Sequence, residues 1–338
     1  MVQLSAGCKT VTLQPHPAHG VSGDLTLTEK LRRHLPWITL VSVLLLVGLR
    51  DINFLSPQNL VTLVADVVPL LIMATGMTFV IYIGGIDLSS QSIANMATVL
   101  ATISLPALGV GSALLVIAAG LLFGAVSGVV TTRLKVPSFI STLAVGGIAL
   151  SVGQYASGQQ ALHMDTEQRR HAFGWVTGQT AGIPHILVLA LVIVAIAWFL
   201  QIRMLPGRTL KAIGAGEPVV VASGIRADRY KILAFALSGM FAAIAGLMFS
   251  IRLSGGSPTL AEGFLLPAIV AVLVGGTPLT GGVGGVLNTL IGTMIVAVVR
   301  ASMLYFSIPA TGQQIFFGLV LIVAIATTID RSKMKVVK

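Results

Sequence analysis

A short glycine-rich motif interrupts the apolar sequence of this 338-residue chain twice. Both copies fit the pattern G-G-x-x-L-S/T, at 84–89 and at 275–280, and each has an apolar segment on either side. Within a bilayer, irregular backbone is tolerated only where protein or a water-filled cavity satisfies the freed N–H and C=O groups. Two such breaks at corresponding positions of two halves are typical of a transport pathway built from a duplicated unit. The motif therefore predicts a membrane transport protein.

The composition agrees with a chain that lies mostly in lipid. Hydrophobic residues make up 55% of it and charged residues only 9%, whereas a soluble domain carries about 25% charged residues. We expect an all-α polytopic membrane protein of about ten transmembrane helices, with broken or re-entrant segments and an internal duplication. The apolar segments are 36–49, 59–83, 91–105, 110–132, 137–157, 184–202, 231–251, 265–277, 283–299 and 312–329.

The positive charges predict how these segments are oriented. The net charge of +10 does not indicate nucleic-acid binding, because the charges lie in loops between apolar segments. If the N-terminus is cytoplasmic, 16 of the 21 Lys and Arg residues fall on the cytoplasmic side and 5 on the other. This bias predicts cytoplasmic tails at 1–34 and 331–338, a transmembrane permease domain at 35–330, a cytoplasmic loop at 203–230 and an outer loop at 158–183. The tail at 1–34 has no apolar core of a cleavable signal peptide.

Three glycines, Gly120, Gly124 and Gly128, form a double G-x-x-x-G motif on the fourth apolar segment. Such spacing lets another helix approach closely. We favour packing within one subunit over a dimer face.

Three acids lie in or beside the apolar segments, and one of them, Glu262, is expected to be a solvated or docking residue of an extracytoplasmic loop. Asp66 is in the middle of a segment, three residues before Pro69, which is expected to bend the helix. A carboxylate at mid-bilayer costs about 2.5–3.5 kcal/mol on insertion scales, so Asp66 is expected to face either a transport cavity or a polar partner on a neighbouring helix. Asp87 lies in the first break, where capping of the following helix is the favoured role. Gly85 is expected to need positive φ and close approach, so Gly85→Val should abolish uptake. The residues expected at the breaks and on the translocation path are Gly84, Gly85, Asp87, Ser89, Gly275, Gly276, Thr277 and Asp66.

The 203–230 loop contains the signature of a short helix at 218–223. Pro218 suits its first position and Gly224 its end, so the loop would expose three valines to solvent. An exposed valine cluster indicates a groove on a protein partner, and the alternative is that the valines fold back onto the membrane-embedded core. The residues expected to couple to an ATPase are Arg208, Glu217, Pro218, Val219, Val220, Val221, Ser223 and Gly224.

Enzymatic chemistry is not indicated. The one cysteine, Cys8, and the six histidines do not pair with other ligands at metal-site spacing. No G-x-x-x-x-G-K-S/T phosphate loop is present, so ATP and magnesium are expected on a separate ATPase subunit and no cofactor on this chain. A membrane enzyme would need clustered acids, bases or metal ligands at one membrane depth, and the sequence has no such cluster. The main alternative function is an ion-coupled secondary transporter that uses Asp66.

Three blocks of sequence resemble the inner-membrane permeases of ribose-type ABC importers, a branch that includes xylose, galactose and autoinducer-2 permeases. The blocks are 76–89 (GMTFVIYIGGIDLS), 206–225 (PGRTLKAIGAGEPVVVASGI) and 252–285, and the stretch 136–143 (VPSFISTL) also looks similar. The resemblance implies import of a monosaccharide or similar small polar solute. It further implies location in a bacterial inner membrane, a second permease subunit, ATPase subunits and a periplasmic solute-binding protein. The coupling helix of that family falls on 218–223.

The chain departs from the family pattern at three places. Ser90, Gln91 and Ser92 replace a usual Ser-Val-Gly-Ser after the first break, and Leu265, Leu266 and Pro267 stand where an acidic residue is common. Gly216 stands in place of a usual Asn before Glu217. These departures leave the expected fold unchanged. They bear on which solute is carried.

Overall fold

The computed structural model describes residues 27–328. The chain divides into two compact units, 1–35 and 36–338, and all packing described below lies within the second. Most of the predicted tails, at 1–26 and 331–338, lies outside the described residues. α1 begins at Leu27, within the predicted N-terminal tail and well before the apolar run at 36–49.

Every predicted apolar segment contains a helix. The helices are α1 (Leu27–Arg50), the 3-10 helix η1 (Ile52–Leu55), α2 (Pro57–Asp66), α3 (Val68–Tyr82), α4 (Ser90–Leu108), α5 (Gly111–Arg133), α6 (Ser138–Ser157), α7 (Thr166–Thr177), α8 (His185–Arg203), α9 (Leu205–Ala222), α10 (Ala227–Leu253), α11 (Leu265–Val274), α12 (Val286–Tyr305) and α13 (Ala310–Thr328). Among the described residues, six helices are long and apolar enough to cross a membrane, and the bent pair α2 and α3 makes a seventh.

The bend predicted near Pro69 is present. α2 begins with Pro57 at its first position and with Ser56 as its cap, whose hydroxyl accepts from the N–H of Asn59. α2 ends at Asp66, and α3 leaves it at an angle of 47°. Pro69 lies in the first turn of α3, where a missing N–H costs nothing.

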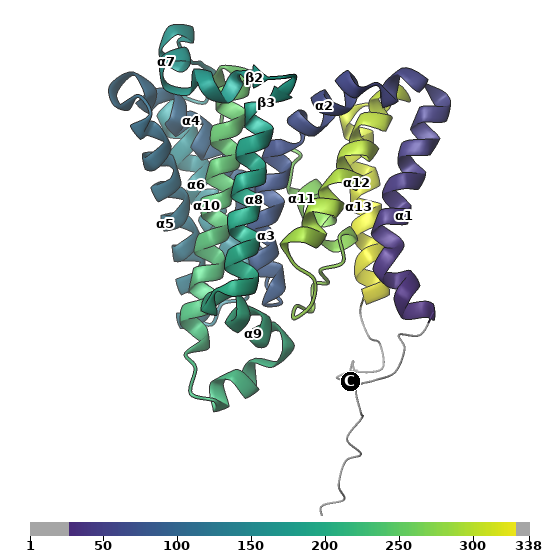
Figure 1. The fold of residues 1–338 in the computed structure, drawn as a ribbon. Coiled ribbons are helices and arrows are strands. Elements are labelled where there is room, and N and C mark those ends of the chain that lie inside the picture. Colours follow the sequence, from purple (N-terminus) through teal and green to yellow (C-terminus); the bar gives the residue numbers. More distant parts are fainter. Residues whose placement is uncertain (1–26, 329–338) are drawn as a thin grey trace, which may run out of the picture. The chain divides into compact units, whose positions relative to one another are not determined.

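α3 is the core of the unit. All of its residues are buried, and apolar side chains cover every face of it. It packs against α10, α11, α12 and α8. A helix that is apolar all round needs neighbours on every side, and α3 lies among them (Figure 1).

The G-x-x-x-G glycines of α5 pack within the chain, as we favoured from the sequence. A Cβ on Gly124 would overlap with the carbonyl oxygen of Phe235 in α10, and a Cβ on Gly128 would lie 2.7 Å from Cα of Ile232. Gly239 of α10 approaches Gly120 and Gly124 in return. The two helices thus touch backbone to backbone.

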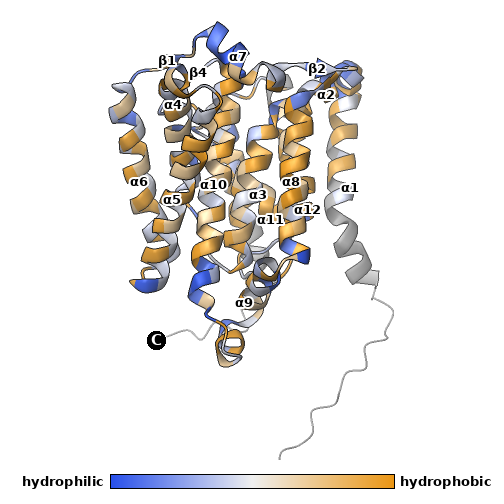
Figure 2. Ribbon diagram, turned by 60° about the vertical axis from the view of Figure 1, so that its left-hand side comes forward, coloured by the Kyte–Doolittle hydropathy of each residue, from blue (hydrophilic) through white to orange (hydrophobic). Residues whose placement is uncertain are grey.

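Polar segments gather at the two ends of the helices. α7 and two short strand pairs lie at one end, and α9 lies at the other (Figure 1). The pairs join β1 (Leu162–His163) to β4 (Gly255–Gly256) and β2 (Gln179–Thr180) to β3 (Ile183–Pro184), both antiparallel. Hydrophilic residues mark α7 and parts of α9, while the helices between them are mainly hydrophobic (Figure 2). The 158–183 and 203–230 loops therefore lie at opposite ends.

Candidate functional site

Both glycine-rich breaks terminate a helix in the same way. α3 and α11 each end in a Schellman motif, in which a residue with positive φ follows the last turn and two N–H groups bond back to that turn. The residue with positive φ is Gly84 (φ 75°) in the first break and Gly276 (φ 103°) in the second. The bonds run from Gly84 N to Ile81 O, Gly85 N to Val80 O, Gly276 N to Leu273 O and Thr277 N to Val272 O, at 2.9–3.1 Å.

One detail of the sequence prediction is wrong. Gly85 does not have positive φ; its neighbour Gly84 has it. The close approach expected at Gly85 is present, since a Cβ there would lie 3.0 Å from Cγ1 of Val80 and 3.4 Å from Cζ of Phe235. In the second break Gly275 is still right-handed and Gly276 is left-handed. The two motifs are therefore offset by one residue relative to the aligned sequences.

The two breaks lie against each other. The N–H of Gly282 donates to the carbonyl oxygen of Tyr82 at 2.9 Å. A Cβ on Gly281 would lie 2.7 Å from both the carbonyl oxygen of Tyr82 and the nitrogen of Gly84. Gly281 and Gly282 have φ values of 76° and 78°, which favour glycine. The second break therefore needs these glycines to follow the backbone of the first.

The 203–230 loop reaches the same place. A Cβ on Gly214, in α9, would overlap with the carbonyl oxygen of Tyr82 and with the nitrogen of Gly282. The next residue, Ala215, lies beside Gly282. A Cβ on Gly282 would be 2.9 Å from the Ala215 nitrogen. We call the meeting point of 82–85, 280–282 and 214–215 the junction. Three segments that are distant in sequence touch there through their backbones.

A short helix follows the junction within α9. The backbone is interrupted at Gly216 (φ 175°, ψ 89°), so the last turns of α9 form a separate short helix. It ends at Gly224 (φ 80°), where Gly224 N bonds to Val221 O and Ile225 N to Val220 O. Glu217, at the start of this helix, accepts from Nζ of Lys231 in α10 at 2.6 Å. The ion pair and the terminal glycine thus hold the helix at both ends.

The valines of this short helix do not all face solvent. Val219 and Val221 are 72% and 54% exposed. Val220 is only 6% exposed, which corrects the prediction that all three are exposed. It packs in a small cluster with Ile213 and Ala227, against which Ile83 of the first break is also packed. Val219 and Val221 thus fit the predicted partner groove, and Val220 fits the alternative of folding back onto the core. Successive helical side chains point in different directions, so both predictions apply.

The other loop residues lie around the short helix. Ser223 is exposed, and its hydroxyl donates to the carbonyl oxygen of Val219 at 3.0 Å. Arg208 donates from Nε to the carbonyl oxygen of Ile202 at 3.3 Å. Arg208 also lines a cavity of about 400 Å³ beside the second break, together with Gln201 and other residues. Gln201 accepts there from the N–H of Val286, the first residue of α12, at 2.8 Å.

Asp87 is buried within a group of serines. Its Oδ1 accepts from the N–H of Ser89 at 2.8 Å and from the Ser89 hydroxyl at 2.5 Å. Its Oδ2 accepts from the hydroxyls of Ser90 at 3.0 Å and Ser238 at 2.5 Å. Among residues 27–328, no basic side chain lies within ion-pair distance of it. The carboxylate thus lies at the N-terminus of α4, a favourable place for negative charge, and ties α4 to α10.

Asp66 does not lie in the middle of a continuous helix, where the sequence placed it. It is the last residue of α2, at the 47° bend, and its side chain is 55% exposed. It forms an ion pair with Arg252, in the last turn of α10, and Arg252 also donates to the carbonyl oxygen of Ala65. Of the two environments expected for Asp66, the structure has the polar partner on a neighbouring helix.

Polar side chains on one face of α4 support an irregular segment that the sequence reading does not single out. The hydroxyl of Thr98 accepts from Ser257 N at 3.0 Å, and Asn95 Oδ1 accepts from Ala261 N at 2.6 Å. Gln91 Oε1 accepts from Leu265 N at 3.2 Å. Residues 91, 95 and 98 have the spacing of one helix face. Polar residues at this spacing in an apolar helix are the signal that could have revealed them.

The other break residues are also engaged by neighbouring polar groups. Thr277 is fully buried and accepts from the N–H of Gly285 at 3.0 Å. Ser138 and Thr142 of α6 accept from the N–H groups of Ile86 and Leu88 at 3.1 and 3.0 Å. Protein groups thus satisfy these N–H groups of the irregular backbone, as lipid requires. Among the described residues, no three His, Cys, Asp or Glu side chains gather into a possible metal site.

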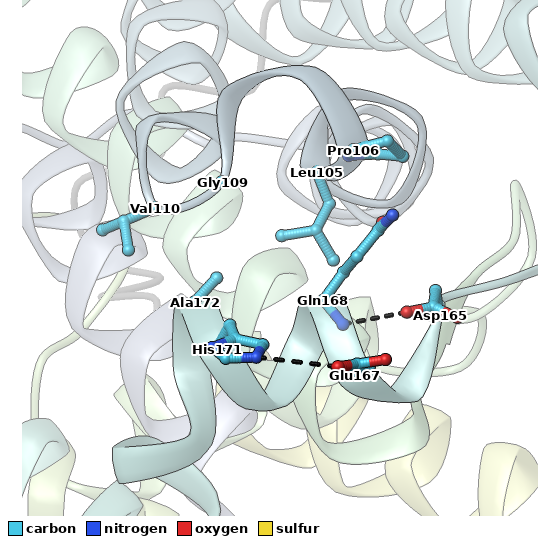
Figure 3. A pocket seen from close by; sticks show the side chains of 9 residues that line it. All are labelled: Leu105, Pro106, Gly109, Val110, Asp165, Glu167, Gln168, His171 and Ala172. Atoms are coloured by element: carbon cyan, nitrogen blue, oxygen red, sulfur yellow. Dashed lines mark hydrogen bonds and ion pairs between the residues drawn. The ribbon is translucent and has the colours of Figure 1, made fainter.

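A cavity of about 580 Å³ with a mixed polar and apolar lining lies at the end of the unit opposite α9, between α7 and the turn that joins α4 to α5. Asp165 accepts there from the N–H of Gln168 at 2.8 Å, and Glu167 lies 3.9 Å from His171 (Figure 3). The side chain of Gln168 extends from α7 toward Pro106 (Figure 3). We call this the outer cavity.

Comparison with known proteins agrees with this architecture. A sequence profile of the family described as "Branched-chain amino acid transport system / permease component" matches residues 59–325. The ribose import permease protein RbsC of Haemophilus influenzae is 33% identical over 294 residues, covering 86% of this chain and 90% of the relative. RbsC of Bacillus subtilis is 32% identical (88% and 92% covered), and the xylose transport system permease protein XylH of Escherichia coli is 30% identical (81% and 86%). No solved structure matches the chain. Because the profile covers most of the chain and these relatives match along nearly their whole length, the chain belongs to this family of ABC transporter permease subunits.

Proposed function

We propose that this permease subunit imports a monosaccharide, delivered by a solute-binding protein and driven by ATP hydrolysis on a separate ATPase subunit. The relatives compared above carry ribose and xylose in their names, and a further relative, from Azospirillum brasilense, is an L-arabinose permease that is 31% identical. The family description names branched-chain amino acids instead. We favour a sugar because the individual relatives that match almost end to end are sugar permeases.

The junction is the observation that carries the mechanism. The exposed side chains of Val219 and Val221 offer an apolar surface to an ATPase groove. Movement of the short helix would act on the first break through Val220 and Ile83, and on both breaks through Gly214. Because packed backbones transmit displacement with little deformation, closure of the ATPases would shift α3 and α11 together. In this proposal Glu217 and Lys231 keep the short helix attached to α10 as it moves.

We propose ten transmembrane segments with both termini cytoplasmic, in a bacterial inner membrane. The opposite placement of α7 and α9 supports this, as does the excess of Lys and Arg at the α9 end. The matching Schellman ends of α3 and α11 support an internal duplication. The α2–α3 pair would cross as one bent span, and α11 with its preceding segment would form a broken one.

The proposed partners follow from the same arrangement. A second permease subunit, identical or related, would complete the pathway, and ATPase subunits with ATP and magnesium would bind at α9. A periplasmic solute-binding protein would dock at the α7 end, where the acids lining the outer cavity offer hydrogen-bond acceptors. Lipid surrounds the exposed apolar side chains of the outer helices.

The test is uptake by proteoliposomes that contain the permease with its ATPase subunits and its solute-binding protein. We expect ATP-dependent accumulation of radiolabelled D-ribose, D-xylose or L-arabinose, and none of L-leucine. Uptake of leucine alone would instead assign the chain to amino-acid transport. Uptake driven by a proton or sodium gradient without ATP would favour the secondary-transporter alternative.

A further inference from the structure

A second cavity lies where the irregular segment after α10 meets α11. This segment, 257–264, runs along the polar face of α4 and is held there by Thr98, Asn95 and Gln91. At its end is an open cavity of about 520 Å³, within the range of about 300–1,000 Å³ typical of small-molecule sites. We call it the Gln91 cavity. It is lined by Gln91, Glu262, Gly263, Leu265, Leu266, Thr311 and Gln314.

The orientation of both carboxamides in this cavity is set by the backbone. Gln91 Oε1 accepts from Leu265 N at 3.2 Å, so its NH₂ group points away from the Leu265 backbone. Gln314 Nε2 donates to the carbonyl oxygen of Gly263 at 3.1 Å, so its Oε1 points away from the Gly263 backbone. Within the part of the chain that the structure describes, neither remaining group has a hydrogen-bond partner. The cavity thus offers a donor group from α4 and an acceptor group from α13.

From this geometry we infer that the Gln91 cavity is a solute-recognition site on the translocation path, which takes a small polyhydroxylated solute. The inference rests on the proposed import of a monosaccharide. A sugar hydroxyl both donates and accepts, so it matches a carboxamide donor on one side and a carboxamide acceptor on the other. Leu265 and Leu266 offer apolar surface to its C–H groups, and the Thr311 hydroxyl and Glu262 carboxylate add further polar groups.

The position of the cavity supports the same role. α11 starts at the cavity with Leu265 and ends at Val274, directly before the second break. At 1.5 Å per residue its ten residues span about 15 Å. One short helix therefore connects the groups proposed to bind the solute with the second break, which leads into the junction where the 203–230 loop makes contact. Gln91, Leu265 and Leu266 are also positions at which the chain departs from the permease pattern that it resembles.

The decisive variant is Gln91→Glu. Glutamate keeps an oxygen to accept from Leu265 N–H but removes the NH₂ donors of this cavity-lining residue. A second variant, Thr311→Val, removes an exposed hydroxyl that has no hydrogen-bond partner among the described residues, and leaves side-chain volume nearly unchanged. The matched control is Gln313→Glu, which makes the same chemical change on α13 at a residue that does not line the cavity.

The measurement is uptake of radiolabelled D-ribose and D-xylose by proteoliposomes of the complete complex, at saturating sugar-loaded binding protein. We expect Gln91→Glu to lower ribose uptake about three- to tenfold, the effect of one lost hydrogen bond. Thr311→Val should change uptake less, and both variants should change the ratio of ribose to xylose uptake. Gln313→Glu should behave as wild type.

Two failures can be told apart. Wild-type complex that transports neither sugar would overturn the proposed function, and this inference with it. Wild-type complex that transports sugar while Gln91→Glu and Thr311→Val match Gln313→Glu, in both rate and sugar ratio, would overturn the Gln91 cavity alone. If Gln91→Glu lowers the amount of assembled complex, Thr311→Val decides the result.

Discussion

The N–H of Gly282 donates to the carbonyl oxygen of Tyr82 at 2.9 Å, so a direct backbone hydrogen bond joins the segment after the second glycine-rich break to the end of α3, just before the first break. Gly214 packs against both of these atoms from a third segment. In the proposed mechanism, a displacement of the 203–230 loop would therefore act at one point on the end of α3 and on the segment that follows the second break.

Replacing Gly214 with valine should uncouple this contact. A Cβ at this position overlaps with backbone atoms of both breaks, so the segments must separate. We expect most of the uptake to be lost, while the ATPase still co-purifies with the variant. Gly147→Ala is the control, because a Cβ there meets nothing within 4 Å. Normal uptake by Gly214→Val would remove the junction from the mechanism.

The three valines of the short helix should respond differently to aspartate. Val219→Asp with Val221→Asp should leave the permease folded but weaken ATPase binding, since burial of a valine contributes about 1.5–3 kcal/mol at most. Val220→Asp should instead destabilise the loop, because it places a charge in a buried cluster. Co-purification of the ATPase and thermal unfolding in detergent measure the two effects. Full ATPase recovery with the Val219 and Val221 pair would contradict the docking surface.

The carboxylate of Asp87 should be important for stability. Asp87→Ala leaves the buried hydroxyls of Ser89, Ser90 and Ser238 without their acceptor, and we expect a loss of about 2–4 kcal/mol in unfolding free energy. Ser238→Ala should cost less in the Asp87→Ala background than in wild type, because the two groups interact. The double-mutant cycle is measured by unfolding in detergent. Additive losses would show that the network is not coupled.

Removing the charge of Asp66 should have little effect. Its side chain is half exposed, and an exposed ion pair contributes about 0–1 kcal/mol. Asp66→Asn should therefore retain uptake within about twofold, and a proton ionophore should not abolish ATP-driven uptake. The same uptake assay checks both. Complete loss of transport in folded Asp66→Asn would restore a role for this residue in the pathway.

The orientation in the membrane can be tested by cysteine labelling. Cys8 is first replaced by serine, since it is the only native cysteine. Glu167→Cys and Ala222→Cys then place single thiols at exposed positions at the two ends of the helices. We expect a membrane-impermeant maleimide to label residue 167 from the periplasm and residue 222 only in inverted vesicles. Labelling of both from one side would overturn the topology.

Much of this architecture could be predicted from residues close in sequence. Helical segments follow from long apolar runs, the bend follows from Pro69, and the helix ends follow from Gly84, Gly224 and Gly276, because these depend on local propensity and backbone conformation. The G-x-x-x-G spacing indicated close packing without identifying the partner helix. Gly85 was the residue expected to have positive φ, but the choice between adjacent glycines depends on where the preceding helix stops.

Long-range contacts determined what the sequence alone left open. The burial of Val220, the ion pair of Asp66 and the meeting of Tyr82, Gly214 and Gly282 each join residues brought together only by packing. The sequence by itself determined that the helices break at two glycine pairs and that a loop can carry a short helix. Only the tertiary structure decided that these parts touch, because which backbones approach each other depends on how α3, α9 and α11 fill the same space.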